Sequence, residues 1–188
     1  MLRPYRKEDC EQTARLFYET VHAVNAKDYA PRQLAAWAPA VPQPEVWHAS
    51  FCGHYALVAE ENGAVVGFGD IDGTGYLDRL YVHKDYQGRG IATALCAALE
   101  QYAAGMPVTV HASVTARPFF EKHGVALAAR DPDVGFACLS GSVHGASHES
   151  NRYVLSVCVE VLHLFAESCG KFDKIYLRPS ACRTRNDM

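Results

Sequence analysis

The 188-residue chain lacks the cysteine spacing that builds a zinc site or a disulfide framework. It holds seven cysteines, an odd number, and no two of them form a Cys-x-x-Cys pair. Structural zinc sites and the disulfides of small secreted domains both draw on closely spaced cysteines. We therefore predict a protein without structural disulfides and without a metal.

The chain also lacks an excess of positive charge and any long apolar run. It carries 18 Lys and Arg residues against 21 Asp and Glu residues, for a net charge of -3. Such a chain offers no basic field for a phosphate backbone, so nucleic acid is not an expected partner. No apolar run approaches the ~20 residues of a membrane helix, and none of secretory length follows the first residues. We expect one cytoplasmic domain that does not enter a membrane.

What the sequence does contain is a strand, a glycine turn and a helix in direct succession. Residues 76–82 mix β-branched, aromatic and polar side chains as a strand does, and apolar residues recur at helical spacing from Ile91 to Tyr102. The junction between them is Gln87-Gly88-Arg89-Gly90. A helix start leaves N–H groups unpaired, and glycines let a ligand approach the backbone, so this junction predicts an anion site.

Three kinds of phosphate-binding turn can be compared with this junction. A P-loop requires Gly-x-x-x-x-Gly-Lys-Ser/Thr, which occurs nowhere in the chain. A dinucleotide fingerprint requires a third small residue, where Thr93 stands, and an acidic residue at the end of the next strand, where residues 111–113 are His-Ala-Ser. The third kind fits. Gln87-Gly88-Arg89-Gly90-Ile91-Ala92, preceded by Leu80-Tyr81-Val82, resembles the Gln/Arg-x-x-Gly-x-Gly/Ala turn of the GCN5-related N-acetyltransferase (GNAT) family.

The resemblance to GNAT acetyltransferases continues in a second motif, Phe119-Phe120-Glu121-Lys122-His123-Gly124, and reaches back to the first strand. It implies an α/β (α+β) fold, with a mixed central sheet, flanking helices and acetyl-CoA bound at the turn and the fourth strand. By this resemblance, the residues that would bind acetyl-CoA are Leu80, Tyr81, Val82, Gln87, Gly88, Arg89, Gly90, Ile91, Ala92, Thr93 and Ser113.

The other elements follow from local patterns. We predict strands over residues 2–6, 54–60, 65–71, 76–82, 108–113 and 125–129, and helices that begin near residues 8, 31, 91 and 118. Asn62-Gly63 between two β-rich runs predicts a tight hairpin. The strand-helix-strand order around the glycine turn predicts that the fourth and fifth strands are parallel. The resemblance adds that these two strands splay apart at one end.

The resemblance ends near residue 131, so we divide the chain into a GNAT-like core of residues 1–130 and an atypical segment of residues 131–188. Residues 152–162 alternate between apolar and polar side chains and would supply a last strand that closes the sheet. Residues 181–188 have the composition of a disordered end.

The implied reaction is attack of an amine on the thioester of acetyl-CoA. An alkyl amine with a pKa near 10.4 is only about one part in 2,500 unprotonated at pH 7, so the reaction calls for a base. Asp78 on the fourth strand and His111 on the fifth are the candidates, with a water relay as the alternative. The tyrosine that commonly protonates the leaving sulfur corresponds here to Phe120. The thiolate then leaves unaided, or another hydroxyl protonates it, for which the candidates are Tyr81, Ser113 and Tyr153.

In GNAT acetyltransferases the segment between the first two strands covers the acceptor. The resemblance makes His22, Asn25, Tyr29 and Trp37 candidates for acceptor contacts, although Tyr29 and Trp37 would equally serve to pack two helices together. We expect an N-acetyltransferase that acts on a primary amine of a small molecule or peptide. The alternative is a non-catalytic acyl-CoA-binding module, which Phe120 favours. The sequence leaves open the identity of the acceptor and whether the chain forms a homodimer.

Overall fold

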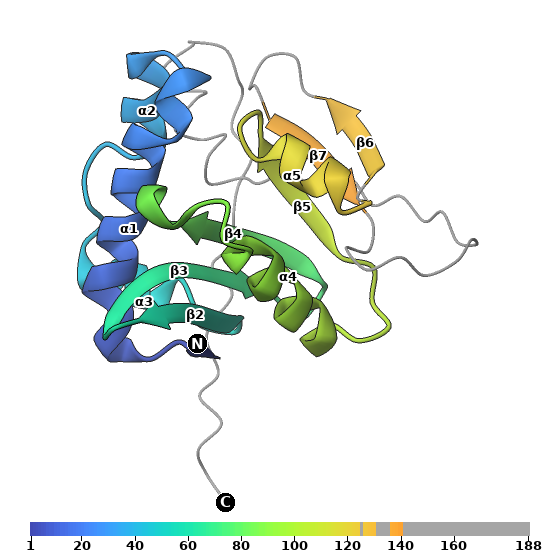
Figure 1. Ribbon diagram of the computed structural model, residues 1–188, viewed down its shortest axis with the longest axis horizontal. Coiled ribbons are helices and arrows are strands. Elements are labelled where there is room, and N and C mark those ends of the chain that lie inside the picture. Colours follow the sequence, from blue (N-terminus) through green and yellow to red (C-terminus); the bar gives the residue numbers. More distant parts are fainter. Residues whose placement is uncertain (125, 131–135, 141–188) are drawn as a thin grey trace, which may run out of the picture.

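The computed structural model describes residues 1–124, 126–130 and 136–140 of the chain (Figure 1). Its centre is a seven-stranded sheet with the order β1-β2-β3-β4-β5-β7-β6. The strands are β1 (Leu2–Pro4), β2 (Tyr55–Glu61), β3 (Ala64–Ile71), β4 (Tyr76–Val82), β5 (Thr109–Ser113), β6 (Ala126–Arg130) and β7 (Phe136–Ser140). All neighbouring strands are antiparallel except β4 and β5, which are parallel. The sheet is therefore mixed, as the resemblance implies.

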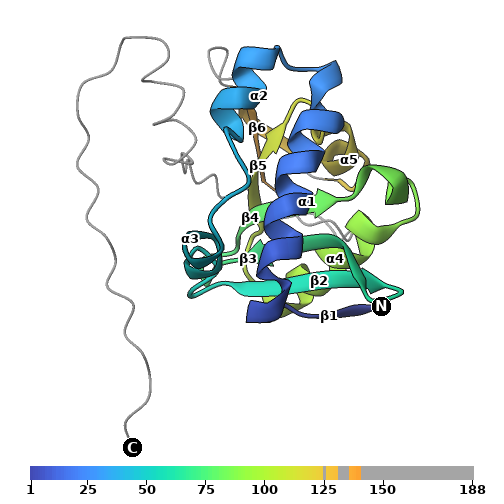
Figure 2. The same cartoon turned by 90° about the vertical axis from the view of Figure 1, so that its left-hand side faces the viewer.

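Helices cover both faces of the sheet. They are α1 (Cys10–Ala23), α2 (Pro31–Trp37), α3 (Pro44–Ala49), α4 (Ile91–Tyr102) and α5 (Arg117–Lys122), with short 3-10 turns at Lys7–Asp9, Asn25–Lys27 and Lys84–Tyr86. α1 and α3 pack on one face and α4 and α5 on the other, which the views in Figures 1 and 2 show from two sides. Among the described helices, none has the length and apolarity needed to cross a bilayer. The predicted fold class is confirmed.

Side chains along β2 alternate between the two layers of the core. Leu57 and Ala59 join a buried cluster with Leu95 and Leu99 of α4, whereas Val58 joins the cluster beneath α1. A shift of β2 by one residue would exchange these faces, so the two clusters fix its register.

The predicted hairpin between β2 and β3 is confirmed. Asn62 and Gly63 have φ angles of 53° and 80°, and the strands pair on both sides of them. Positive φ at both central residues is the geometry that the right-handed twist of a two-residue hairpin requires, and Asn-Gly adopts it with little strain.

β4 and β5 are joined over two residue pairs only, Tyr76 with Thr109 and Leu77 with Val110. Beyond these pairs β4 continues to Val82 and stays paired with β3, while β5 pairs along its length with β7. Figure 1 shows the two strands diverging into a fork. The splay that the resemblance implies is therefore present.

A β-bulge at Asp78 marks the point of divergence. Arg79 pairs with Asp70 of β3 and Leu77 pairs with Ile71, so Asp78 is the extra residue between them. A bulge bends its strand and changes the direction of the side chains beside it. β4 therefore changes direction at the residue where β5 leaves it.

Two elements differ from the sequence prediction. No helix is predicted near residue 44, but Pro44 is the first residue of α3, because its fixed φ and missing N–H suit a helix start. β7 lies between β5 and β6, and no local pattern predicts it. The strand predicted over residues 152–162 and the disordered end predicted over residues 181–188 both lie outside the described residues.

Candidate active site

A cleft of about 510 Å³ opens where β4 and β5 diverge. It extends from the N-terminus of α4, past the fork, to the connector that follows α1. Of the residues predicted to bind acetyl-CoA, all except Arg89 line this cleft. The two candidate bases, Asp78 and His111, line it as well. The structure thus brings the glycine turn and the predicted catalytic groups into one cavity.

The end of the cleft at α4 is a glycine turn that exposes backbone N–H groups. Gly88 and Gly90 have φ angles of 75° and 80°, which glycine adopts without strain. The first hydrogen bond of α4 runs from the Ala94 N–H to the Gly90 carbonyl at 2.9 Å, so the N–H groups of residues 91–93 lie at the open helix end. A Cβ atom on either glycine would meet nothing within 4 Å. The turn leaves room for an anion at the positive end of the helix dipole.

The side chains of Gln87 and Arg89 leave this turn in different directions, Gln87 toward β4 and Arg89 toward Tyr86 and Glu61. Gln87 Nε2 donates to the carbonyl of Val82, the last residue of β4, at 3.3 Å, which ties the turn to the strand. The Arg89 guanidinium lies 4.6 Å from the centre of the Tyr86 ring and 3.5 Å from a carboxylate oxygen of Glu61. Arg89 is therefore on the outside of the turn, apart from the other residues predicted to bind acetyl-CoA.

The candidate bases lie on the two arms of the fork. Asp78 and His111 each follow the last pair that joins β4 to β5. The Asp78 carboxylate has Nη2 of Arg79 at 3.3 Å. The His111 ring has the Tyr76 hydroxyl at 3.0 Å from Nδ1. Each candidate base is thus held by a neighbouring side chain of β4.

Arg79 and Asp70 form a buried ion pair beside Asp78. Asp70 is 0% exposed and Arg79 is 8% exposed. Nε and Nη2 of Arg79 donate to the two oxygens of Asp70 at 2.9 Å each, and Nη1 and Nη2 donate to the hydroxyl and carbonyl of Ser50 at 2.7 and 2.9 Å. The guanidinium also lies 3.9 Å from the centre of the Phe51 ring. These contacts compensate the cost of burying two charges.

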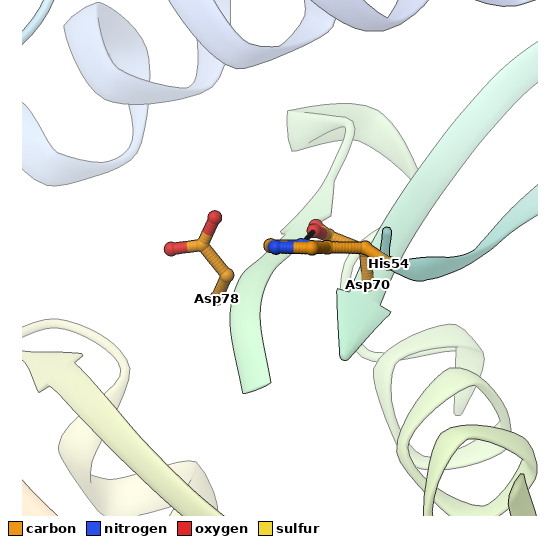
Figure 3. Close-up of side chains that lie close together, drawn as sticks. All are labelled: His54, Asp70 and Asp78. Carbon is orange, nitrogen blue, oxygen red and sulfur yellow. Dashed lines mark hydrogen bonds and ion pairs between the residues drawn. The ribbon is translucent and has the colours of Figure 1, made fainter. Parts of the chain in front are cut away.

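His54, immediately before β2, joins this ion pair. Its Nδ1 lies 2.6 Å from Oδ2 of Asp70. Figure 3 shows the imidazole next to Asp70, with one edge turned toward Asp78. The hydrogen bond with Asp70 raises the pKa of His54 above its ordinary value, and the negative charges of Asp70 and Asp78 act in the same direction, against the effect of burial. The network therefore favours a protonated imidazole beside the candidate base.

Within the described part of the chain, His54, Asp70 and Asp78 are the one group that brings three potential metal ligands within 4.8 Å of one another. Both carboxylates already face the Arg79 guanidinium, whose positive charge opposes a second cation there. We assign no metal to this group. The sequence does contain one His-x-x-x-His pair with the spacing of metal ligands, His144 and His148, and both residues lie outside the described residues.

Comparison with known proteins decides the family. The sequence model described as the acetyltransferase (GNAT) domain matches residues 25–130, more than half of the chain. The chain belongs to the GNAT family of acetyltransferases. Over 124 residues it is 34% identical to the uncharacterised N-acetyltransferase YafP of Escherichia coli strain K12, a match that covers 65% of this chain and 79% of YafP.

Solved GNAT structures have the same fold. A GCN5-related N-acetyltransferase from Rhodopseudomonas palustris matches with a TM-score of 0.70 and 34% identity, over 76% of this chain and 94% of that protein. PaiA N-acetyltransferase from Thermoplasma acidophilum, solved with coenzyme A, matches with a TM-score of 0.64 and 18% identity, over 76% and 98%. YncA from Salmonella typhimurium, a putative acetyltransferase solved with acetyl-CoA, matches with a TM-score of 0.58 and 18% identity, over 80% and 97%. The last two matches show the shared fold alone.

The residues predicted to contact the acceptor of this GNAT acetyltransferase divide into two pairs. Asn25 and Trp37 line the cleft. His22 and Tyr29 are not part of its lining. His22 Nε2 lies 2.8 Å from the carbonyl of Ala38, and the Tyr29 ring packs against Trp37 with their centres 5.5 Å apart. Tyr29 and Trp37 thus pack against each other, which is the alternative that the sequence leaves open. Trp37 also lines the cleft.

Tyr29 also connects the segment after α1 to the end of β5. Its hydroxyl accepts a hydrogen bond from the Val114 N–H at 2.9 Å, and beside it the Thr115 hydroxyl donates to Asp28 at 2.6 Å. Burial raises the pKa of Tyr29 above its ordinary value, although the hydrogen bond from Val114 acts against this. No sequence motif indicates this link, because its partners are 85 and 87 residues apart.

The position of the expected proton-donating tyrosine is occupied by Phe120, which is 3% exposed and lines the cleft from the core. Tyr81 and Ser113 line the same cleft. The Ser113 hydroxyl oxygen accepts a hydrogen bond from the Ala116 N–H at 3.1 Å. Tyr153, the third alternative, lies outside the described residues.

One cleft residue that the motif comparison does not single out is His123, directly after α5. Its Nδ1 lies 2.7 Å from the carbonyl of Phe119, and its Nε2 lies 3.0 Å from the hydroxyl of Thr93. A carbonyl only accepts, so Nδ1 carries the proton and a neutral ring accepts from Thr93 at Nε2. Because Thr93 is in the first turn of α4, these contacts of His123 join the end of α5 to the start of α4.

Proposed function

We propose that this GNAT acetyltransferase transfers the acetyl group of acetyl-CoA to a primary amine of a small molecule or peptide. The amine attacks the thioester directly in a ternary complex. The observation that carries the proposal is one cleft that holds both an open helix end and two candidate bases at the fork. Such a cleft can bind the phosphates of the donor at one end and deprotonate an amine further along.

The donor would lie along β4. Its pyrophosphate would accept hydrogen bonds from the N–H groups of residues 91–93, next to Gly88 and Gly90. Residues 80–82 pair with β3 on one side, and among the described residues no strand pairs with their other side. Backbone groups on that side can bind the amide groups of an extended pantetheine arm. The coenzyme A and acetyl-CoA complexes of PaiA and YncA, which share this fold, support the choice of donor.

The base in this proposal is Asp78 or His111. Both lie at the fork, where an arm that extends along β4 from the glycine turn would bring its thioester. We favour Asp78 because it adjoins a charged network, in which Arg79 contacts both Asp78 and Asp70. The base must remove a proton from an ammonium group whose unperturbed pKa is about 10.4.

The leaving thiol needs less assistance than the amine. A thiol with a pKa of about 8.5 departs as a thiolate, so the absence of a hydroxyl at Phe120 does not prevent the reaction. A general acid contributes about 10²- to 10⁴-fold in rate, and either Tyr81 or Ser113 would be close enough to the cleft to act as one. Replacing Tyr81 by phenylalanine and Ser113 by alanine, one at a time, measures that contribution.

Release of free thiol from acetyl-CoA, measured over a panel of primary amines and short peptides, tests the proposal. We expect amine-dependent thiol release, with a matching gain of one acetyl group on the amine by mass spectrometry. A reaction that contains the enzyme and acetyl-CoA but no amine gives the rate of simple hydrolysis and serves as the control.

A second candidate function is an acyl-CoA-binding module without catalysis, which the phenylalanine at position 120 favours. It predicts binding of CoA in calorimetry and no thiol release with any amine. Absence of CoA binding would contradict both candidates, because both place the pyrophosphate on the same turn.

A further inference from the structure

The imidazole of His54 adjoins two carboxylates, one buried and one in the cleft (Figure 3). Its Nδ1 is 2.6 Å from Oδ2 of Asp70, and one of its nitrogens lies within 4.8 Å of an Asp78 oxygen. One water molecule, or a small side-chain rotation, spans such a separation. His54 itself is not part of the cleft lining, so it can reach the reaction only through Asp78.

The net charge of this network favours the uptake of one proton. Asp70 and Asp78 contribute two negative charges and Arg79 one positive charge, so the network is at -1 with a neutral imidazole and at 0 with a protonated one. The groups that act on His54 are Asp70 and Asp78, which favour its protonated form, and Arg79, which opposes it. Asp72 is also near enough for the charge of His54 to influence it.

We propose that His54 accepts the proton that the acceptor amine loses, with Asp78 as the group through which the proton passes. This inference rests on the proposed function. The amine, as R-NH3⁺, gives one proton through Asp78 to His54, and then attacks the acetyl carbon. When the C–S bond breaks, the second amine proton goes, directly or through a water molecule, to the CoA thiolate. His54 returns its proton to solvent, so the sum is one N-acetyl amine, one CoA and one released proton.

An imidazole is a better final acceptor here than a carboxylate. From an amine with a pKa of about 10.4, proton transfer to a carboxylate with a pKa of about 3.9 is unfavourable by about 10⁶-fold. Transfer to an imidazole with a pKa of about 6.5 is unfavourable by only about 10⁴-fold. The hydrogen bond with Asp70 raises the pKa of His54 and so brings it closer to the pKa of the amine. His54 is thus a positioning residue that acts on the substrate only through Asp78, by taking up the proton that Asp78 passes on.

The test is the pH dependence of kcat for the wild type and His54→Gln, with an amine that the wild type acetylates. kcat reports groups in the enzyme–substrate complex. We expect the wild-type rate to rise to a plateau through a pKa above about 6.5, and His54→Gln to lose that rise and fall by about tenfold or more at the plateau. Glutamine can still donate to Asp70, so the packing role is retained. His48→Gln is the matched control, because His48 contacts Tyr5 at 3.2 Å outside the cleft, and it should follow the wild-type curve.

A second measurement tests whether His54 accepts the proton even if His54→Gln does not fold. The ring protons of His54 in the wild type with CoA bound are titrated by NMR, and their midpoint should coincide with the kinetic pKa. A different midpoint, or a His54→Gln curve that matches the wild type, overturns the relay and leaves the proposed function standing. If the wild type acetylates no amine, the proposed function fails and the relay fails with it.

Discussion

Replacement of Gly90 separates two reasons for a glycine at the start of α4. Its φ of 80° is a conformation in which an ordinary residue costs about 1–2 kcal/mol, yet a Cβ there would meet nothing within 4 Å. We therefore expect Gly90→Ala to lower the free energy of unfolding by about 1–2 kcal/mol. Gly90→Asn should lower it by less, because asparagine tolerates this region better.

The proposed function places the CoA pyrophosphate next to Gly90, so we expect a Cβ there to obstruct its approach to the backbone N–H groups. Loss of one hydrogen bond to a charged group costs about 1.5–3 kcal/mol. That loss corresponds to a dissociation constant for CoA that is weaker by about 10- to 150-fold. Alanine and asparagine both add a Cβ, so both variants should bind CoA more weakly despite their different stabilities.

Urea unfolding measures the stability and isothermal titration calorimetry measures the affinity for CoA. Gly53 provides the matched control, because its φ is 82°, its added Cβ would also meet nothing within 4 Å, and it does not line the cleft. Gly53→Ala should lose a similar amount of stability and bind CoA as the wild type does. An unchanged CoA affinity in both folded Gly90 variants would refute the placement of the pyrophosphate.

Three further predictions concern charged groups. Asp78→Asn should lower kcat by about 10²-fold or more in the thiol-release assay if Asp78 is the base, whereas His111→Gln should do so if His111 is, and near-wild-type rates in both variants would exclude both. Arg79→Met should lower the free energy of unfolding in urea by about 3–5 kcal/mol, because it removes two hydrogen bonds and a positive charge from the buried Asp70 carboxylate and leaves it with His54, and a loss below about 1 kcal/mol would contradict this reasoning. Burial alone would raise the pKa of Asp9, but two hydrogen bonds from Arg3 at 2.7 Å lower it, so this pair stabilises the fold fully above the ordinary pKa of about 3.9 and loses its effect as the pH falls below that value. Arg3→Met should flatten this part of the curve of unfolding free energy against pH.

The parts of the fold that could be predicted are those whose physical cause lies within a few neighbouring residues. Asn62-Gly63 determines a hairpin because both residues accept positive φ, and the glycine turn before α4 determines a helix start for the same reason. A strand, a helix and a second strand in succession favour a crossover connection in which the two strands are parallel, as β4 and β5 are. The residues predicted to bind acetyl-CoA come from the resemblance to the GNAT turn, and nearly all of them lie on β4, on the turn or at the start of α4.

The parts that could not be predicted depend on contacts between distant segments. His54 and Arg79 meet at Asp70 because three segments pair side by side, and neither residue stands in a recognisable motif. One local signal was present, since Asp70 is a charged residue in an otherwise apolar strand, and such a residue needs a buried partner. β7 lies between β5 and β6 and pairs with both, and side-chain alternation along a strand does not indicate which strands it will pair with.

The fork has a consequence for how the molecule opens. Within the described residues, two pairs form the ladder between β1–β4 and the strands β5, β7 and β6, so amide hydrogen exchange should report two cooperative units with separate opening free energies. A ligand that contacts both arms favours only the state in which both are closed. At a CoA concentration 100 times its dissociation constant, the linkage is worth about 2.7 kcal/mol. Exchange in both units should then slow together, so that the ligand, more than the sheet, makes the two halves behave as one.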